Sequence, residues 1–220
     1  CMINLPPGTS EYEMISFDKG FHGRSLGCLS VSYSKPIHKI GIPAFKWHKV
    51  EFPSSIYCQK SNSTIFNQEN EDLVLNRVYE ILQKNKKIAG LIIEPIQSEG
   101  GDNHASNGFF KKLRNICADF DITFIVDEVQ TGMGATGKFW AHEHWNLDNP
   151  PDIVTFAKKA QISGFFAKKE LIPQFPFQIF NTWMGDATRT MLLTEILKII
   201  FEDKLIDNVS KTGNYLFNNL

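Results

Sequence analysis

The feature that most constrains the fold is a set of three short apolar runs, at residues 88–93, 122–126 and 153–156. Short runs that are almost entirely apolar are typical of strands that are buried on both faces, as in parallel sheets. Between the first two runs, apolar residues recur at helical spacing (Phe110, Leu113, Ile116 and Cys117). A strand, helix, strand order pairs its strands in parallel through right-handed crossovers. The sequence therefore predicts an α/β fold with a mainly parallel sheet flanked by helices.

The rest of the chain is less regular. Apolar residues at helical spacing predict a helix from Glu71 to the lysines that follow Leu82, and an amphipathic segment at 191–200 predicts another, with more helix towards Leu220. The stretch before Pro53 is broken by Gly and Pro, which indicates short strands and loops with a turn at 20–23. The polar stretch 59–70 is predicted to be a surface loop or insertion.

Charge and cysteine content exclude several classes of function. The 23 Lys and Arg residues nearly balance 24 Asp and Glu residues, so we expect neither a nucleic-acid nor a membrane partner. No apolar run approaches the roughly 20 residues that span a bilayer, and no signal peptide is recognisable. The four cysteines show no zinc-like or disulfide-like spacing. The sequence thus predicts a soluble protein in a reducing compartment, without a metal site.

Each apolar run is followed by polar residues that can carry chemistry. Glu94 follows the first run, Asp127 the second, and Lys158 and Lys159 the third. The carboxyl ends of parallel strands meet at one edge of a sheet, where open α/β sheets bind their ligands. We therefore expect these side chains to converge on one crevice.

Asp127 and Lys159 together suggest a particular cofactor. A buried carboxylate needs a cation or hydrogen-bond donors, and Asp127 alone could equally cap a helix or pair with a core Arg. Lys159 alone could be a solvated lysine. In a cleft of low dielectric, however, its amine loses a proton more easily and can form a Schiff base with an aldehyde. An amine for the aldehyde and a carboxylate for the pyridine nitrogen are what pyridoxal 5'-phosphate (PLP) requires.

Two other sequence patterns resemble a phosphate-binding loop and a metal site. Residues 132–138 match the G-x-x-x-x-G-K pattern of nucleotide triphosphatases, but Phe139 replaces the Ser or Thr that would bind the metal. The loop also follows the acidic strand instead of opening its own strand–loop–helix unit. These glycines are better explained as a turn that needs positive φ angles. His142 and His144 have a spacing that would suit a metal site if a third ligand converged, but two polar helix or turn positions beside Trp145 are the favoured interpretation.

The order and spacing of longer motifs identify a family. The segments FHGR, EPIQSEGGDNHAS, VDEVQTG, TGKFWAHEHW, TFAKK and IFNTW closely resemble the class III (fold-type I) PLP-dependent aminotransferases, and the resemblance covers essentially the whole chain. It implies transamination of 4-aminobutyrate with 2-oxoglutarate. The alternatives are another ω-amino acid such as β-alanine or an ornithine-like substrate, or a truncated paralogue that binds PLP without catalysis.

The resemblance also implies roles for individual residues around the cofactor. Lys159 would form the Schiff base and shuttle a proton, with Lys158 as the alternative. Asp127 would pair with the pyridinium nitrogen, and Gln130 would hydrogen-bond the phenolic oxygen. The two ring faces would be covered by Val129 and Phe21.

Substrate and partner contacts follow from the same motifs. Arg24 would bind the substrate carboxylate, and Glu94 would lie near substrate and cofactor. Glu99 would form a switchable ion pair with an arginine of a C-terminal small domain, so that one pocket accepts both mono- and dicarboxylates. Thr182 would reach the cofactor phosphate of the neighbouring subunit, which implies a homodimer with shared active sites.

The resemblance finally sets the expected extent of the chain. Residues 1–220 are predicted to form part of the large, PLP-binding domain, with an N-terminal segment and the C-terminal small domain absent. The family's usual address in animals is the mitochondrial matrix, and a cytoplasmic location is the alternative. Two local departures are TGMGAT, where relatives are richer in glycine, and AQISG after Lys159, where they have a glycine pair.

Overall fold

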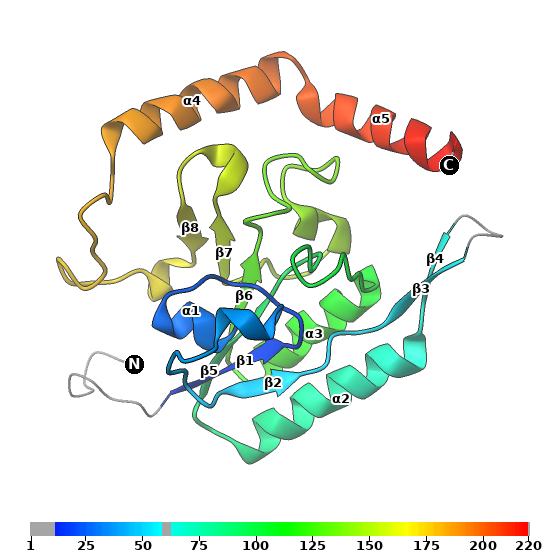
Figure 1. Ribbon diagram of the computed structural model, residues 1–220, viewed down its shortest axis with the longest axis vertical. Helices are drawn as coiled ribbons and strands as arrows, with labels where there is room; N and C mark the ends of the chain where they lie inside the picture. Colours follow the sequence, from blue (N-terminus) through cyan, green and yellow to red (C-terminus); the bar gives the residue numbers. More distant parts are fainter. Residues whose placement is uncertain (1–11, 59–62, 220) are drawn as a thin grey trace.

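The computed structural model describes residues 12–58 and 63–219, in which a six-stranded sheet is covered by helices (Figure 1). The strand order is β2-β1-β5-β6-β7-β8, and all neighbours pair in parallel except β7 and β8, which are antiparallel. The strands are β1 (Glu13–Phe17), β2 (His48–Val50), β5 (Ile88–Ile93), β6 (Thr123–Asp127), β7 (Ile153–Phe156) and β8 (Gly164–Ala167). The predicted mainly parallel α/β fold and its three apolar strands are therefore confirmed.

The stretch 59–70 was predicted to be a surface loop or insertion, and the loop prediction was wrong for the residues that the structure describes. Strand β4 (Ser63–Phe66) pairs with β3 (Ser55–Cys58) as an antiparallel hairpin. Helix α2 (Gln68–Lys84) then begins three residues before Glu71, because the Asn67 side chain accepts a hydrogen bond from the Asn70 amide at 3.1 Å and caps the helix. The strands of the hairpin have only four residues each, and Ile56 and Ile65 are exposed, so no long apolar run indicated them.

Helices α2 and α3 (Asn107–Asp119) pack together and supply much of the main core. The buried Glu71 of α2 joins the two helices, because its carboxylate accepts hydrogen bonds from the amide and hydroxyl of Ser106, both at 2.7 Å. Ser106 in turn caps α3 through the Phe109 amide at 3.1 Å. Phe110 of α3 stacks on Trp145 with ring centroids 4.0 Å apart. The apolar face predicted for α3 is therefore the one that it buries.

The C-terminal helices α4 (Ala187–Glu202) and α5 (Leu205–Asn219) cross one end of the molecule, beyond the loops that follow β6 and β7 (Figure 1). They agree with the two helices predicted there. A second, smaller apolar cluster holds them to those loops around Met133, Ala160 and Ile200. The remaining elements are α1 (Leu26–Ser30) and the short 3-10 helices η2 (Pro36–His38), η3 (Ala141–Trp145), η4 (Lys158–Ala160) and η5 (Lys169–Leu171).

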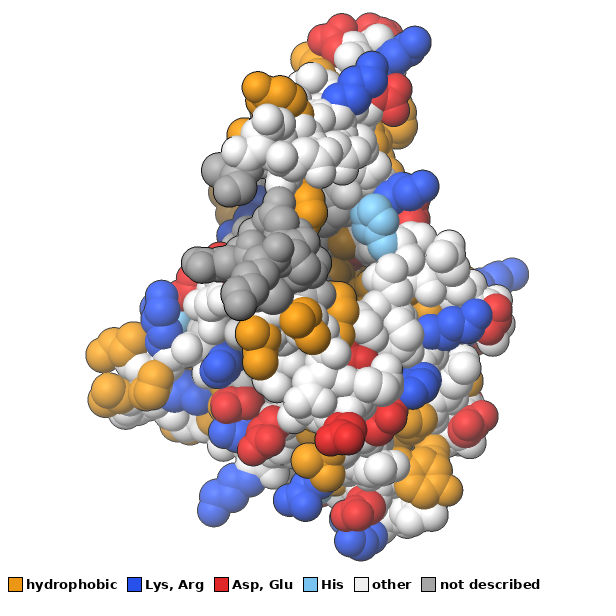
Figure 2. Space-filling model, turned by 90° about the vertical axis from the view of Figure 1, so that its right-hand side faces the viewer, with side chains coloured by type: hydrophobic (Ala, Val, Ile, Leu, Met, Phe, Trp, Pro, Cys, Tyr) orange, Lys and Arg blue, Asp and Glu red, His pale blue; other side chains and the backbone are white. Residues whose placement is uncertain are grey.

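Acidic, basic and hydrophobic side chains are interspersed on the face drawn in Figure 2. This mixture agrees with the net charge of −1. In the part of the chain that the structure describes, no helix is both long and apolar enough to cross a membrane.

Candidate active site

Four strand ends come together at the carboxyl edge of the sheet. The loop after β1 carries Phe21 and His22, β5 leads into Glu94, β6 ends at Asp127, and β7 leads into η4 with Lys159. Hydrogen bonds join these loops across the strands, including one from the Phe21 amide to Glu94 Oε1 at 2.8 Å. The parallel pairing of β1, β5, β6 and β7 thus produces the expected convergence.

Asp127 is buried, with 6% of its surface exposed, and three hydrogen bonds satisfy its carboxylate. Oδ1 accepts from the Val129 amide at 3.1 Å and from the Thr155 hydroxyl at 3.0 Å. Oδ2 lies 2.8 Å from Nδ1 of His22, whose side chain is 2% exposed. The sequence predicts that Asp127 needs such donors but does not identify His22. This histidine belongs to the FHGR motif, but it lies 105 residues from Asp127 along the chain, so the sequence gives no sign that the two side chains meet.

Glu94 is the second buried carboxyl group of the crevice. It is 4% exposed, and burial raises its pKa from 4.5 to about 7, although nearby His22 and the bond from the Phe21 amide act in the opposite direction. The negative charges of Asp127 and Glu99 add to the increase. Near neutral pH the Glu94 carboxyl can therefore either hold or release a proton.

Lys159 extends from η4 to the loop after β6, where its Nζ donates a hydrogen bond to the Gln130 carbonyl at 2.6 Å. The residue remains exposed, but partial burial and the neighbouring Lys158 lower the pKa of its amine, while Glu128 acts to raise it. Lys158 has a left-handed backbone (φ 49°) and is exposed. Of the two lysines, Lys159 is the one whose amine contacts the loop that leaves Asp127.

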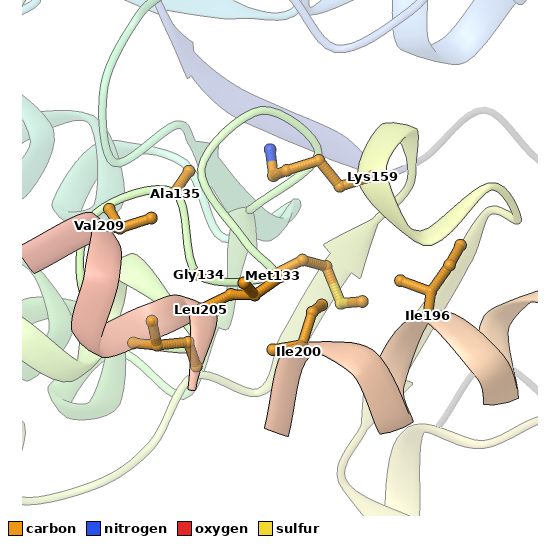
Figure 3. A pocket seen from close by; sticks show the side chains of 9 residues that line it. Met133, Gly134, Ala135, Lys159, Ile196, Ile200, Leu205 and Val209 are labelled. Carbon is orange, nitrogen blue, oxygen red and sulfur yellow. The ribbon is translucent and has the colours of Figure 1, made fainter. Parts of the chain in front are cut away.

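The side chain of Lys159 also lines an apolar cavity of about 280 Å³ (Figure 3). In Figure 3 its nitrogen points away from Ile196 and Ile200, which belong to α4. The aliphatic part of the lysine therefore packs towards α4 and α5, while the amine faces the loop.

The loop between β6 and η3 is held by a buried carboxylate that sequence reasoning missed. Glu128 is 1% exposed and binds the amides of Ala141 and His142, the His142 ring and the Thr131 hydroxyl. His144 is engaged elsewhere, because its Nε2 lies 3.1 Å from the Thr136 carbonyl oxygen. The two histidines are thus polar turn positions with separate partners. No cluster of three or more metal-binding side chains occurs among the described residues.

The glycine-rich loop has the positive φ angles that its composition predicts. Gly134 and Gly137 have φ values of 92° and 81°, and Met133, between glycines, has 62°. A Cβ atom on Gly132 would lie 2.6 Å from the Trp140 ring. The loop continues into turns and η3, whereas a phosphate-binding loop would open an α-helix. This geometry does not fit the nucleotide triphosphatase alternative.

Three of the other predicted residues are half-buried, and one is exposed. Val129 and Gln130 are half-buried beside Asp127, and the half-buried Phe21 ring contacts His38 edge-on, with centroids 5.4 Å apart. Arg24 is exposed, and no described carboxylate forms an ion pair with it.

Among the described residues, neither Glu99 nor Thr182 forms a hydrogen bond with Asp127 or with its partners His22, Val129 and Thr155. Glu99 pairs with Lys35, Nζ to Oε1 at 2.7 Å, at a partly exposed position, and this bond lowers the pKa of Glu99. Thr182 is exposed in the segment between η5 and α4 and makes no hydrogen bond to the described crevice residues. The structure therefore brings Phe21, Glu94, Asp127, Gln130 and Lys159 together, with Thr182 outside this group.

Comparisons with known proteins identify the family of the chain. A model of the class III aminotransferases matches residues 6–220, and the chain belongs to that family. It is 49% identical over its whole length to "4-aminobutyrate aminotransferase, mitochondrial" of Mus musculus, of which it covers 45%. It is 50% identical over 98% of its length to the 4-aminobutyrate aminotransferase of Dictyostelium discoideum, covering 44% of that protein.

Solved structures show the same fold. The lysine aminotransferase of M. tuberculosis, in its internal aldimine form, superimposes with a TM-score of 0.83 at 31% sequence identity, covering 93% of this chain and 47% of that one. The chain thus spans about half the length of the relatives that it matches.

Proposed function

We propose that this protein forms the cofactor-binding part of a PLP-dependent aminotransferase that moves the amino group of 4-aminobutyrate to 2-oxoglutarate. The products would be succinate semialdehyde and glutamate. The observation that carries the proposal is the placement of Lys159 and Asp127 at the ends of adjacent strands, β7 and β6. The family and the names of the relatives in Mus musculus and Dictyostelium discoideum support the substrate.

The residues present fit the cofactor. A carboxylate offers about four acceptor positions, and Asp127 uses three for His22, Val129 and Thr155, so one remains for a protonated ring nitrogen. The Lys159 amine is held by a single carbonyl oxygen, from which it can turn towards an aldehyde. The lowered pKa of Lys159 increases the share of neutral, nucleophilic amine at neutral pH.

When bound, PLP supplies an aldehyde and a ring that can take up an electron pair from the substrate carbon. Asp127 would hold the proton on the ring nitrogen, with its own orientation fixed by His22. Lys159 Nζ would anchor the aldehyde and, once a substrate amine has displaced it, would carry the proton away from the substrate carbon. Val129 and Phe21 would cover the ring faces, and Gln130 would bind the phenolic oxygen.

The substrate carboxylate would be bound by Arg24, whose exposed guanidinium has no competing carboxylate among the described residues. Glu94 would face the substrate and could exchange a proton near neutral pH. Glu99, paired here with Lys35, would be the acid that switches partners when a dicarboxylate enters.

The assembly and location of the enzyme are also part of the proposal. Thr182 is exposed and free to face a second subunit, which agrees with a homodimer in which it reaches the partner's cofactor phosphate. The Mus musculus relative is called mitochondrial, whereas the Dictyostelium discoideum relative carries no such qualifier. We therefore propose the mitochondrial matrix as the location, with the cytoplasm as the alternative.

The decisive experiment is to add PLP to the protein, reduce with borohydride and map the fixed adduct by peptide mass spectrometry. We expect the label at Lys159 and none in Lys159→Ala. Lys158→Ala should keep the label and serves as the matched control. Label at Lys158, or none anywhere, would reject the assigned lysine. A truncated relative without catalysis would retain the label but release no glutamate.

The substrate is tested separately by comparing kcat/KM for 4-aminobutyrate, β-alanine and ornithine with the native-length enzyme. The proposal expects 4-aminobutyrate to be preferred. A higher kcat/KM for either of the others would keep the reaction class and change the substrate.

A further inference from the structure

The loop that connects β6 to η3 carries Val129 and Gln130, and it also holds the amine of Lys159. This contact is the 2.6 Å hydrogen bond from Lys159 Nζ to the backbone oxygen of Gln130. The position of the amine therefore depends on how firmly the loop is fixed. The proposed reaction explains Asp127, Val129 and Gln130, but it assigns nothing to Glu128, which lies between them.

Glu128 fastens both ends of this loop through four hydrogen bonds to one buried carboxylate. At the near end, Oε2 accepts from the Thr131 hydroxyl at 2.5 Å. At the far end, Oε2 accepts from the Ala141 amide at 3.1 Å, and Oε1 accepts from the His142 amide at 2.8 Å and its ring Nδ1 at 2.9 Å. A carboxylate only accepts, so Nδ1 of His142 carries the proton. With an ionised Glu128, all four neighbours donate to its two carboxylate oxygens.

The backbone around Glu128 closes the neck of the same loop. The Gly132 amide donates to the Glu128 carbonyl at 2.8 Å, and Gly132 lies so close to Trp140 that no side chain would fit. Burial of a charge is costly unless it is fully hydrogen-bonded. The Glu128 side chain is 0% exposed and meets this condition through its four donors. Glu128 is one residue after Asp127 and two before Gln130.

We propose that Glu128 and His142 form a clamp that positions the Gln130 carbonyl and, through it, the amine of Lys159. They are positioning residues, since neither contacts the amine directly. The inference rests on the proposed function, in which Lys159 is the reacting amine. It requires that loosening the clamp changes the chemistry of Lys159 and not only the stability of the loop.

The charges around Lys159 give the clamp a second effect. Burial and the positive Lys158 lower the pKa of Lys159, and the carboxylate of Glu128 acts against them. The cavity side of Lys159 is lined by apolar residues of α4 and α5, among them Ile196 and Ile200 (Figure 3). Removing the Glu128 charge should therefore shift the titration of the Lys159 amine to lower pH.

The test measures the rate of Lys159 acetylation by acetic anhydride against pH, without cofactor, in the native-length protein. Peptide mass mapping follows Lys159, with the exposed Lys35 as internal reference. Glu128→Gln should move the midpoint to lower pH, and Glu128→Asp, which keeps the charge, should restore it. Glu143→Gln is the matched control, because Glu143 is an exposed acid of the same η3 segment whose carboxylate binds the Trp140 amide.

Hydrogen exchange reports on the loop itself. In Glu128→Gln and in His142→Gln, the amides of Gly132 and Ala141 should exchange roughly tenfold faster, because weakening the hydrogen bonds between His142 and the Glu128 carboxylate makes local opening of the loop easier. His142→Gln leaves the Glu128 charge in place but loosens the loop whose Gln130 carbonyl accepts from the Lys159 amine, so its acetylation midpoint should move to lower pH by less than in Glu128→Gln. This second variant also serves if Glu128→Gln does not fold.

Three results would overturn the clamp. An unchanged acetylation midpoint in Glu128→Gln would remove the coupling to Lys159, and an equal shift in Glu143→Gln would make it a general charge effect. Wild-type exchange in His142→Gln would show that the loop does not depend on the pair. Failure of the proposed function is distinguished separately, because it would appear as borohydride label absent from Lys159 while the acetylation profiles still differed.

Discussion

The crevice and the C-terminal helices are built in contrasting ways. Around the crevice, the buried groups are polar and almost all satisfied, as for Asp127, Glu128 and Glu94. In α4 and α5, by contrast, Ile200 is the one buried side chain, and large apolar residues such as Met191, Phe201 and Tyr215 are exposed. Hydrogen bonds have strict distances and angles, whereas apolar contacts tolerate small shifts. The crevice should thus be the geometrically exact region and the C-terminal helices the adaptable one.

The two regions meet at Met133. Its side chain belongs to the apolar cluster of α4, while its backbone (φ 62°) lies in the loop held by Glu128. A left-handed conformation costs a residue other than glycine about 1 kcal/mol or more, and burying a Met side chain returns about 2 kcal/mol. Met133 thus stabilises the contact of the loop with α4, although its left-handed backbone is strained.

The largest effect is expected at Asp127, because the crevice depends on charge placement. Asp127→Ala should lower kcat of the native-length enzyme by roughly a hundredfold or more, the usual loss when a preorganised electrostatic contact at a reacting group is removed. Asp148→Asn, an exposed acid, should change kcat little. Steady-state kinetics decide this, and wild-type rates in Asp127→Ala would remove Asp127 from the site.

The second largest effect is expected on the free energy of unfolding, which should fall more for a substitution in the main core than for one in α4. Phe110, 1% exposed and stacked on Trp145, lies in the main core, and Phe110→Ala should lower the free energy of unfolding by about 3–5 kcal/mol. Ile200→Ala removes the buried residue of α4 and should cost about 2 kcal/mol, at the low end of such substitutions. Denaturant unfolding measures both values. Equal losses would mean that α4 is as firmly packed as the core.

Glu94 sharpens the contrast through pH. Its pKa is raised in the fold from 4.5 to about 7, so its stabilising contribution is complete below pH 4.5 and is lost as the pH rises through 7. The loss amounts to about 3 kcal/mol, from 1.36 kcal/mol per pKa unit. Glu94→Gln, which can still accept from the Phe21 amide, should therefore gain about 3 kcal/mol relative to the wild type between pH 4.5 and pH 8. Parallel stability curves for the two proteins would contradict the buried, proton-binding Glu94.

Much of the fold and part of the site could be predicted, because they depend on local pattern. Apolar runs predicted β5, β6 and β7, and the polar residues that follow these runs include Glu94, Asp127 and the pair Lys158 and Lys159. Strand β8 was missed because it is four residues long and follows β7 as a short antiparallel partner. The hairpin of β3 and β4 was missed because each strand has only four residues and β4 lies in a stretch that is otherwise polar.

The partners of the site residues could not be predicted, because they come from distant parts of the chain. His22 meets Asp127 across 105 residues, and Lys35 meets Glu99 across 64. Only the folded sheet brings such pairs together. Sequence pattern therefore locates the groups that follow each strand, whereas the geometry that orients them depends on tertiary structure.

The smallest effect is expected at the Lys35–Glu99 pair, which lies at the solvent-exposed rim of the crevice. The Lys35 side chain is 55% exposed, and exposed ion pairs contribute little to stability. Lys35→Ala should leave the denaturation midpoint unchanged. It should, however, raise the pKa of Glu99, because the hydrogen bond and charge of Lys35 are the main causes of its lowered value. An NMR titration of the Glu99 carboxyl in both proteins measures the shift. If instead the variant unfolded as readily as Phe110→Ala, the rim would be part of the rigid crevice, and Glu99 would be a poor choice for a carboxylate that exchanges partners.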